Sequence, residues 1–325
     1  MEVSSFPAKG PYAERIADDP IFDPAVHLAL ESPRRTYSLA ELGYGAPSAA
    51  LPTQVAATTC FRVLSEEGVA ALYHVCKQLE RFTTSNPRIA RTVRGGVYRS
   101  GFLRDLALSP DVTAHLSGML QTPLAPHGMA HQLAHLNYQP LTPGENVDKW
   151  HADTLQVDYV MFVTDPCSVQ GGEFQYFHGT RDEMAALHGR GETVPPDRVI
   201  APAMPGPGHA VLMQGDHVVH QARGIRDGER ITLVNGYTYL DERASDYSAL
   251  GQLTHADPEA TVFAEYARHM SLRCRALLDD GIERPVFDAD VATHANRLRR
   301  ARRELDDAIH QLETFEHETM RHFGD

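Results

Sequence analysis

The chain has 325 residues, a formal net charge of −13, 42% hydrophobic residues and 22% charged residues. This composition is typical of a folded globular protein, and no run approaches the ~20 apolar residues that a membrane span needs. An acidic balance also disfavours broad binding to nucleic-acid phosphates, so we expect neither a nucleic-acid nor a membrane partner.

The thiols and the first residues indicate a reducing compartment. The four cysteines are widely spread and form no C-x-x-C pair, which is typical of free thiols. Residues 1–10 lack the basic and apolar regions of a secretory signal peptide. We therefore expect a cytoplasmic protein.

Helical periodicity dominates the first part of the chain, residues 1–128. Residues 1 to about 58 predict an irregular arm with one or two short helices. A helix is expected from Ser65 to about Phe82, because acidic residues follow Ser65 and apolar residues recur at helical spacing. Residues 83–101 are polar, basic and glycine-containing, which predicts a loop. A further helix is expected from Ser109 to about residue 120.

The pattern changes to short strands over residues 129–241. Gly and Pro residues separate the apolar runs, which predicts a β-sandwich or barrel, here a jelly roll. A short helix is expected at 180–188, between two strands. The expected strands cover residues 131–138, 158–164, 172–178, 198–201, 209–214, 218–222 and 230–239.

Helices return in residues 242–325, at about 258–279 and 289–322. Leu298, Leu305 and Leu312 recur every seven residues in the second of them. This spacing allows two interpretations. The leucines form a coiled-coil seam of a homodimer, or the two helices pack on each other and on the sheet. The fold class predicted for the whole chain is a mainly β jelly-roll core with helical additions at both ends.

A small set of polar residues in the strand region points to a metal site. His151 and Asp153 form an H-x-D, and residues i and i+2 of a strand point to the same side. His220 supplies a second imidazole, with His217 three residues earlier as the alternative. Two histidines and one carboxylate form the open face that binds non-haem Fe(II). Arg230 follows ten residues later and can hold a carboxylate with its two-pronged guanidinium.

This ordered set resembles the Fe(II)/2-oxoglutarate-dependent dioxygenases, which have a double-stranded β-helix core. The resemblance covers about a third of the chain, from residue 135 to residue 239, and includes Asn137-Tyr138, Gly171-Gly172-Glu173 and Arg230-x-Thr232. It implies that His151, Asp153 and His220 bind Fe(II). It also implies that Arg230 and Thr232 hold the distal carboxylate of 2-oxoglutarate, with O2 as the second co-substrate.

Other residues of the core are weaker candidates. Tyr138 is a candidate for the metal-proximal carboxylate of the keto-acid, and only one of Asn137 and Tyr138 can point inward. Arg94, Gln175 and Asn137 are candidates for substrate binding, although the strand face on which Gln175 lies is open. For Arg94 the competing interpretation is a solvated basic loop.

We expect an oxygenase that oxidises a small molecule, such as an amino acid or a natural-product intermediate, and releases succinate and CO2. Hydroxylation, desaturation, ring closure and epoxidation all stay open. Asp153 disfavours a halogenase, in which a small residue leaves room for halide. The alternatives are an iron oxygenase of the same fold without 2-oxoglutarate, and a metal-binding jelly roll that senses a ligand without turnover.

Overall fold

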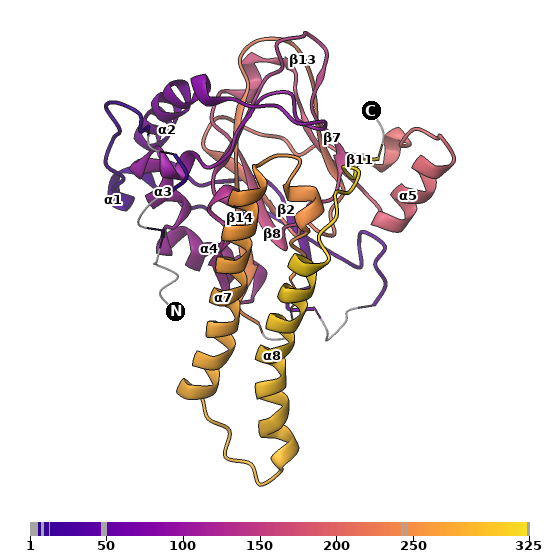
Figure 1. Cartoon of the computed structure of the whole chain (residues 1–325). Coiled ribbons are helices and arrows are strands. Elements are labelled where there is room, and N and C mark those ends of the chain that lie inside the picture. The colour runs from indigo at the N-terminus through magenta and orange to yellow at the C-terminus, as the bar shows by residue number, and fades with distance from the viewer. Residues whose placement is uncertain are drawn as a thin grey trace.

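The computed structural model describes residues 6–7, 10–12, 14–46, 51–241, 244 and 246–323. Two antiparallel sheets form the predicted jelly-roll core, with helices on both sides (Figure 1). The larger sheet has the order β1-β2-β12-β8-β14-β6-β4, with β3 on β12 and β5 on β14. The smaller has the order β11-β10-β13-β7, with β9 on β13.

The strands of the larger sheet are β1 Thr36–Ser38, β2 Val55–Thr58, β3 Phe61–Arg62, β4 Thr92–Val93, β5 Leu124–Pro126, β6 His135–Tyr138, β8 Val157–Phe162, β12 His209–Met213 and β14 Ile231–Tyr239. Those of the smaller sheet are β7 Asn146–His151, β9 Gln170–Gly171, β10 Phe174–Phe177, β11 Val199–Ile200 and β13 His220–Asp227. The α-helices are α1 Pro24–His27, α2 Glu66–Leu79, α3 Gly101–Ala107, α4 Pro110–Leu120, α5 Arg181–Gly189, α6 Leu250–Leu253, α7 Glu259–Glu283 and α8 Val291–Glu313. Short 3₁₀ turns are η1 Glu80–Phe82, η2 Gly96–Tyr98, η3 Ala130–Gln132, η4 Pro166–Ser168 and η5 Pro196–Arg198.

Alternation along the strands of the larger sheet separates two buried layers. Leu136, Tyr138 and Leu233 lie on the outer face and pack with apolar side chains of α2, α3 and α4 in the largest core cluster. Val160 and Val234 lie on the inner face, in a second cluster that also contains β10 side chains of the smaller sheet. The space between the two sheets is therefore partly filled with apolar side chains.

The expected helices of the first part are confirmed, but the arm contributes more than helices. Ser65 and Ser109 cap α2 and α4 as the sequence predicts. Residues 36–62, however, form β1, β2 and β3, and β2 pairs with β12 in the larger sheet. The prediction of an irregular arm was wrong here, because these strands are too short to show periodicity. The predicted loop at 83–101 likewise contains β4, and α3 follows it.

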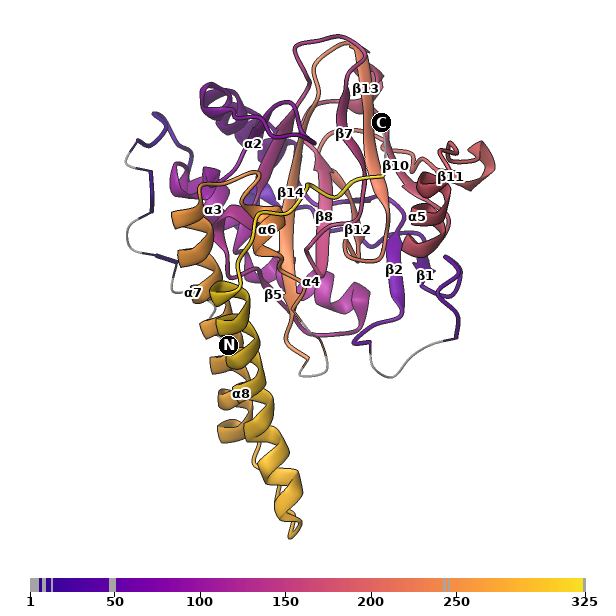
Figure 2. The same cartoon turned by 45° about the vertical axis from the view of Figure 1, so that its right-hand side comes forward.

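The C-terminal helices α7 and α8 form an antiparallel hairpin that projects from the core (Figure 1). Helix α8 ends at Glu313, earlier than predicted, and the segment 314–323 runs back over the core as an extended tail (Figure 2). The Phe323 amide donates to the Trp150 carbonyl on β7 at 2.7 Å. No helix in the described ranges is long and apolar enough to cross a membrane.

Candidate metal centre and its cavity

His151 and His220 lie side by side where β7 and β13 pair. The two residues are direct partners in the antiparallel register, and their ring centroids are 4.1 Å apart. Asp153 comes two residues after the end of β7, and its amide donates to the Gly215 carbonyl at 2.8 Å. Its carboxylate oxygens lie 3.3 Å from His151 Nε2 and 3.5 Å from His220 Nε2. Nitrogen and oxygen atoms of the three residues thus converge on one point.

The backbone around the two histidines fixes which ring nitrogen faces that point. His151 Nδ1 lies 2.6 Å from the Lys149 carbonyl, and His220 Nδ1 lies 2.9 Å from the Val218 carbonyl. A carbonyl can only accept, so each Nδ1 carries a proton and Nε2 is the ring atom that faces Asp153. This is the arrangement that orients a histidine as a metal ligand.

The pKa values of His220 and Asp153 are consistent with binding a metal ion. Burial, with His151 second, lowers the pKa of His220 to about 3, so its ring is neutral at pH 7. Burial alone would raise the pKa of Asp153, but His220 and the hydrogen bond from His151 hold it well below its usual range. Two imidazole Nε2 atoms and one carboxylate therefore face the position that a divalent ion would take.

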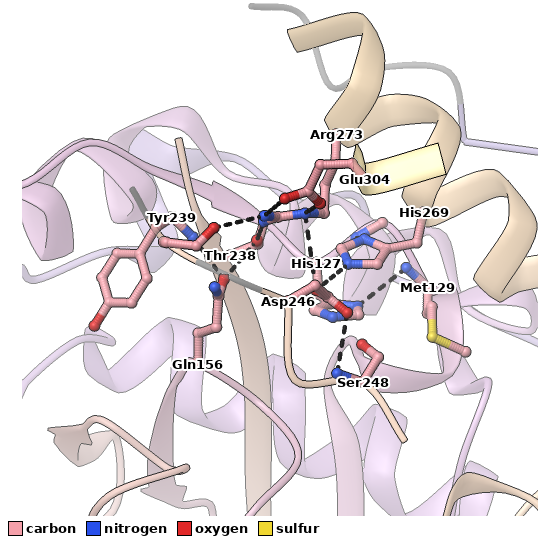
Figure 3. A network of polar contacts seen from close by, with 12 residues as sticks. His127, Met129, Gln156, Thr238, Tyr239, Asp246, Ser248, His269, Arg273 and Glu304 are labelled. Carbon is pink, nitrogen blue, oxygen red and sulfur yellow. Dashed lines mark hydrogen bonds and ion pairs between the residues drawn. The ribbon is translucent and has the colours of Figure 1, made fainter. Parts of the chain in front are cut away.

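A second cluster of two histidines and an aspartate lies near α7, and its hydrogen bonds are reversed (Figure 3). The Met129 amide donates to His127 Nδ1, and the Gly128 amide donates to His269 Nδ1, each at 3.2 Å. Each Nδ1 is therefore the acceptor, so each Nε2 carries the proton and has no lone pair for a metal. His269 Nε2 donates to Asp246 at 2.8 Å. This cluster is a buried hydrogen-bond network, whereas in the cluster at His151 the Nδ1 atoms bond to backbone carbonyls and the Nε2 atoms face the carboxylate.

Arg230 precedes β14 and is 1% exposed. Its Nε donates to the Gly172 carbonyl at 2.8 Å, and Nη1 donates to Thr232 Oγ1 at 3.2 Å. Within the described chain no carboxylate lies within 4.0 Å of this guanidinium. Burial lowers its pKa to about 10. Burying a cation without a carboxylate in contact carries a desolvation penalty, which a bound anion would offset.

Gly172 explains part of the Gly171-Gly172-Glu173 motif. It has a φ of +73°, and a Cβ on it would lie 2.9 Å from the Cδ of Arg230. Any other residue would be strained there and would push the arginine side chain aside.

A cavity of about 540 Å³ opens beside Asp153. Loop 86–94, the start of α5 and the tail form its walls. Arg94 lines it, as expected, but Arg94 Nε also donates to Asp257 at 2.7 Å. The cationic or imidazole side chains on the lining are Arg88, Arg94, His135, Arg181, His188, Arg321 and His322.

Sequence reasoning missed two parts of this wall, His135 and the C-terminal tail. His135 is 8% exposed, and neither ring nitrogen has a hydrogen-bond partner among the described residues. Burial, with Arg94 second, lowers its pKa to about 3, so this unpaired ring is neutral. Arg88 lies 2.9 Å from Asp148 and 3.9 Å from Asp153. The tail brings Phe323 to the cavity, which no local pattern indicates.

The structure corrects the expected orientation of Tyr138. Its hydroxyl donates to the Cys76 carbonyl on α2 at 2.7 Å, so the side chain points out of the core of the sandwich and away from Arg230. Asn137 is the residue of this pair that points inward. It pairs in register with Thr232, and residues directly opposite each other share a face.

Gln175 and His217 do not point toward His151, Asp153 and His220. Gln175 accepts a hydrogen bond from its register partner Gln221 at 2.8 Å, on the outer face of the smaller sheet, since its neighbours Phe174 and Tyr176 fill the inner face. Gln175 lines a separate hollow of about 650 Å³ there. The His217 ring pairs with Asp216 at 2.7 Å, so His220 is the histidine that joins His151 and Asp153.

Comparisons by sequence find no matching family model and no matching curated protein. By structure, the chain is similar to SnoK, a non-haem α-ketoglutarate-dependent carbocyclase from nogalamycin biosynthesis (20% identity, 61% of this chain and 88% of that chain, TM-score 0.42). It is also similar to HygX from Streptomyces hygroscopicus with nickel and 2-oxoglutarate bound (15%, 58% and 83%, 0.39). A third similar structure is EctD from S. alaskensis (16%, 68% and 83%, 0.43). At this level of identity the likeness concerns the fold.

Proposed function

We propose that the protein is an Fe(II)- and 2-oxoglutarate-dependent oxygenase that acts on a small molecule. The observation that carries this proposal is the pairing of two features in one sandwich. His151, Asp153 and His220 present two Nε2 atoms and a carboxylate to one point. Arg230, between the same two sheets, is a buried cation without a carboxylate partner in the described part of the chain.

The donor set suits Fe(II), since three protein ligands on one face leave positions for a keto-acid and oxygen. His151, Asp153 and His220 would hold the ion, with the Nδ1 hydrogen bonds fixing both rings. Arg230 and Thr232 would hold the distal carboxylate of the keto-acid, and Asn137 would lie beside it. When bound, the iron and 2-oxoglutarate together activate O2, leaving succinate, CO2 and an oxidised substrate.

The walls of the cavity support a polar or anionic substrate, such as the amino acid that the sequence analysis named as one possibility. Arg88 and Arg94 are each paired with an aspartate. Arg181 donates to the Asp216 carbonyl at 2.9 Å but has no carboxylate within 4.0 Å among the described residues. We infer that Arg181 holds a substrate carboxylate and that neutral His135 donates or accepts one hydrogen bond near the metal.

Succinate release tests the proposal. The purified protein is incubated in air with Fe(II), ascorbate and 2-oxoglutarate, alone and with a panel of amino acids and related acids. We expect Fe(II)-dependent succinate that rises with at least one member of the panel and is absent in Asp153→Ala. A wild-type rate equal to that of Asp153→Ala throughout would contradict it. Substrate oxidation without succinate would instead favour an oxygenase that uses no keto-acid.

A further inference from the structure

A second hollow lies on the outer face of the smaller sheet, opposite the face that carries His151 and His220. Its volume is about 650 Å³, similar to that of the metal cavity, and β10 and β13 form its floor. Helix α5, the segment 191–201 and the end of the described tail form its walls (Figure 2). Small-molecule sites are concave, largely apolar and contain a few convergent polar groups. The proposed function gives this outer hollow, and Gln175 within it, no role.

Two buried glutamines on the floor present unused polar atoms to the outer hollow. Gln175 is 9% exposed and Gln221 is 7% exposed, and Gln221 Nε2 donates to Gln175 Oε1 at 2.8 Å. Neither side chain has another hydrogen bond within the described part of the chain. An amide side chain has one oxygen acceptor and two N–H donors, so Gln175 keeps free donors and Gln221 keeps a free acceptor. A ligand group with both a donor and an acceptor would satisfy the pair.

The walls beside the glutamines are apolar. Trp150 and Met184 are buried in one cluster, and Val199 and Phe323 pack against it. All four side chains line the outer hollow. Walls of this kind stabilise the hydrocarbon part of a ligand by removing it from water.

Arg223 supplies a positive charge at the same floor. It comes two residues after Gln221 on β13, so the two side chains share the outer face, with Cα atoms roughly 7 Å apart. Arg223 is exposed and has no carboxylate within 4.0 Å among the residues that the structure describes. Glu192, the acidic residue on the lining, is held by Arg190 through two hydrogen bonds of 2.8 Å. The guanidinium of Arg223 is therefore available to a carboxylate of a ligand.

We propose that the outer hollow binds a carboxylic acid that has an apolar chain and an amide between the chain and the carboxylate, as in an N-acyl amino acid. The chain lies on Trp150 and Phe323, and the carboxylate binds Arg223. The amide of the ligand supplies the acceptor and the donor that Gln175 and Gln221 lack. This proposal does not rest on the proposed catalytic function.

The fluorescence of Trp150 tests the proposal, because this residue is the one tryptophan of the chain. The probe is N-octanoylglycine, titrated into the full-length protein. We expect a saturable change in fluorescence with a Kd below ~1 mM. Octanoate, which lacks the amide, and N-acetylglycine, which lacks the apolar chain, should each bind at least ~10-fold more weakly.

Variants test the charge and the glutamine pair separately. Arg223→Met should weaken binding of N-octanoylglycine by at least ~10-fold and leave binding of its uncharged methyl ester unchanged. The matched control is Arg226→Met, because Arg226 is exposed on the same strand but does not line the outer hollow. Gln175→Leu/Gln221→Leu should weaken binding of N-octanoylglycine more than binding of octanoate. Circular dichroism establishes that each variant is folded.

Three results would overturn the proposal. The first is a wild type whose fluorescence shows no saturable change. The second is a folded Arg223→Met variant that binds N-octanoylglycine as tightly as the Arg226→Met control. The third is binding that is lost in Arg181→Met and kept in Arg223→Met, which would place the acid in the metal cavity.

Such an acid has two sources, because His188 and Phe323 line both the outer hollow and the metal cavity. It is the far part of a substrate that reaches the metal centre, or it is a separate ligand. Mass spectrometry after incubation with Fe(II), 2-oxoglutarate and air distinguishes them. An oxidised acid, formed with an equal amount of succinate, identifies a substrate, and an acid recovered unchanged identifies a separate ligand. Binding that depends on Arg223 supports the site in both cases.

Discussion

Replacing Arg230 with methionine tests whether this arginine binds 2-oxoglutarate or only stabilises the fold. Methionine fills a similar volume but has no charge and no donor. The wild-type guanidinium is buried without a carboxylate partner in the described chain, so it destabilises the protein that lacks 2-oxoglutarate and is compensated only when an anion binds. The variant should therefore keep its stability and lose its response to 2-oxoglutarate.

The magnitude follows from the pKa of Arg230, which burial lowers from 12.5 to about 10. At roughly 1.4 kcal/mol per pH unit, this shift corresponds to a penalty on the order of 3 kcal/mol. The unfolded chain binds more protons between pH 10 and 12.5, so the penalty is complete below pH 10 and disappears above 12.5. It is therefore fully present at pH 7. Methionine removes it and loses hydrogen bonds to Gly172 and Thr232, at about 1 kcal/mol each. The net change in the free energy of unfolding is a gain of roughly 1 kcal/mol.

Chemical denaturation with and without 2-oxoglutarate measures both effects, with Mn(II) in place of iron to prevent turnover. At 100 times its Kd, 2-oxoglutarate stabilises the wild type by about 2.7 kcal/mol. Losing one partner of a buried charge pair weakens binding by ~2–5 kcal/mol, which leaves the variant less than about 1 kcal/mol of stabilisation at the same concentration.

The matched control is Arg273→Met, a buried arginine that pairs with Glu304 and lies on α7. It should lower the free energy of unfolding by about 2 kcal/mol or more and keep the full response to 2-oxoglutarate. If Arg230→Met is as destabilised as this control, or responds to 2-oxoglutarate like the wild type, then Arg230 is a structural residue.

Three further changes test other parts of the structure. His135→Ala removes a ring without hydrogen-bond partners, so the free energy of unfolding should stay within about 1 kcal/mol of wild type. The amount of oxidised substrate formed per succinate released should fall. A folded variant in which this ratio is unchanged would remove His135 from the site. Deleting residues 316–325 removes the tail from the cavity wall. The rate of succinate release without substrate should rise several-fold, while 2-oxoglutarate should still stabilise the variant against denaturation. An unchanged rate of succinate release without substrate would show that the tail does not exclude water. Burial alone would raise the pKa of Asp246, but His269 holds it well below its usual value of 3.8, so its stabilisation is present above pH 3.8 and declines at lower pH. Asp246→Asn should therefore lower the free energy of unfolding at pH 7, and this free energy should fall less steeply toward acid pH than in the wild type. Denaturation at several pH values measures both effects. An equally steep fall in the variant and the wild type would refute this.

The candidate metal centre stands out in the sequence because its parts are local patterns, and the structure brings those parts together. His151 and Asp153 are two residues apart, as are Arg230 and Thr232. Even so, the physical reason needed correction. Asp153 lies after β7 rather than in it, and the Gly215 carbonyl holds its backbone in place.

Orientation was harder to predict, because a strand residue faces inward or outward according to its register with strands far away in the sequence. Asn137 faces inward because it pairs with Thr232, and Gln175 faces outward because it pairs with Gln221. Neither partner is close in sequence.

The position of the C-terminal tail could not be predicted from the sequence either. Residues 316–323 have no apolar periodicity of their own, and their place depends on contacts with residues far away in the sequence. Gln252 of α6 donates to the Thr319 carbonyl at 3.0 Å, and Phe323 donates to Trp150 of β7. A segment that folds by contacts of this kind leaves no local pattern.

We propose that His151, Asp153 and His220 bind Fe(II) together with 2-oxoglutarate, and that the cluster at His127 does not. The most direct measurement is the visible charge-transfer band that forms when Fe(II) and 2-oxoglutarate are added without oxygen. We predict the band in the wild type and in His127→Asn, and its loss in His220→Ala. A wild type without the band, or a band that survives in His220→Ala and is lost in His127→Asn, would contradict the claim.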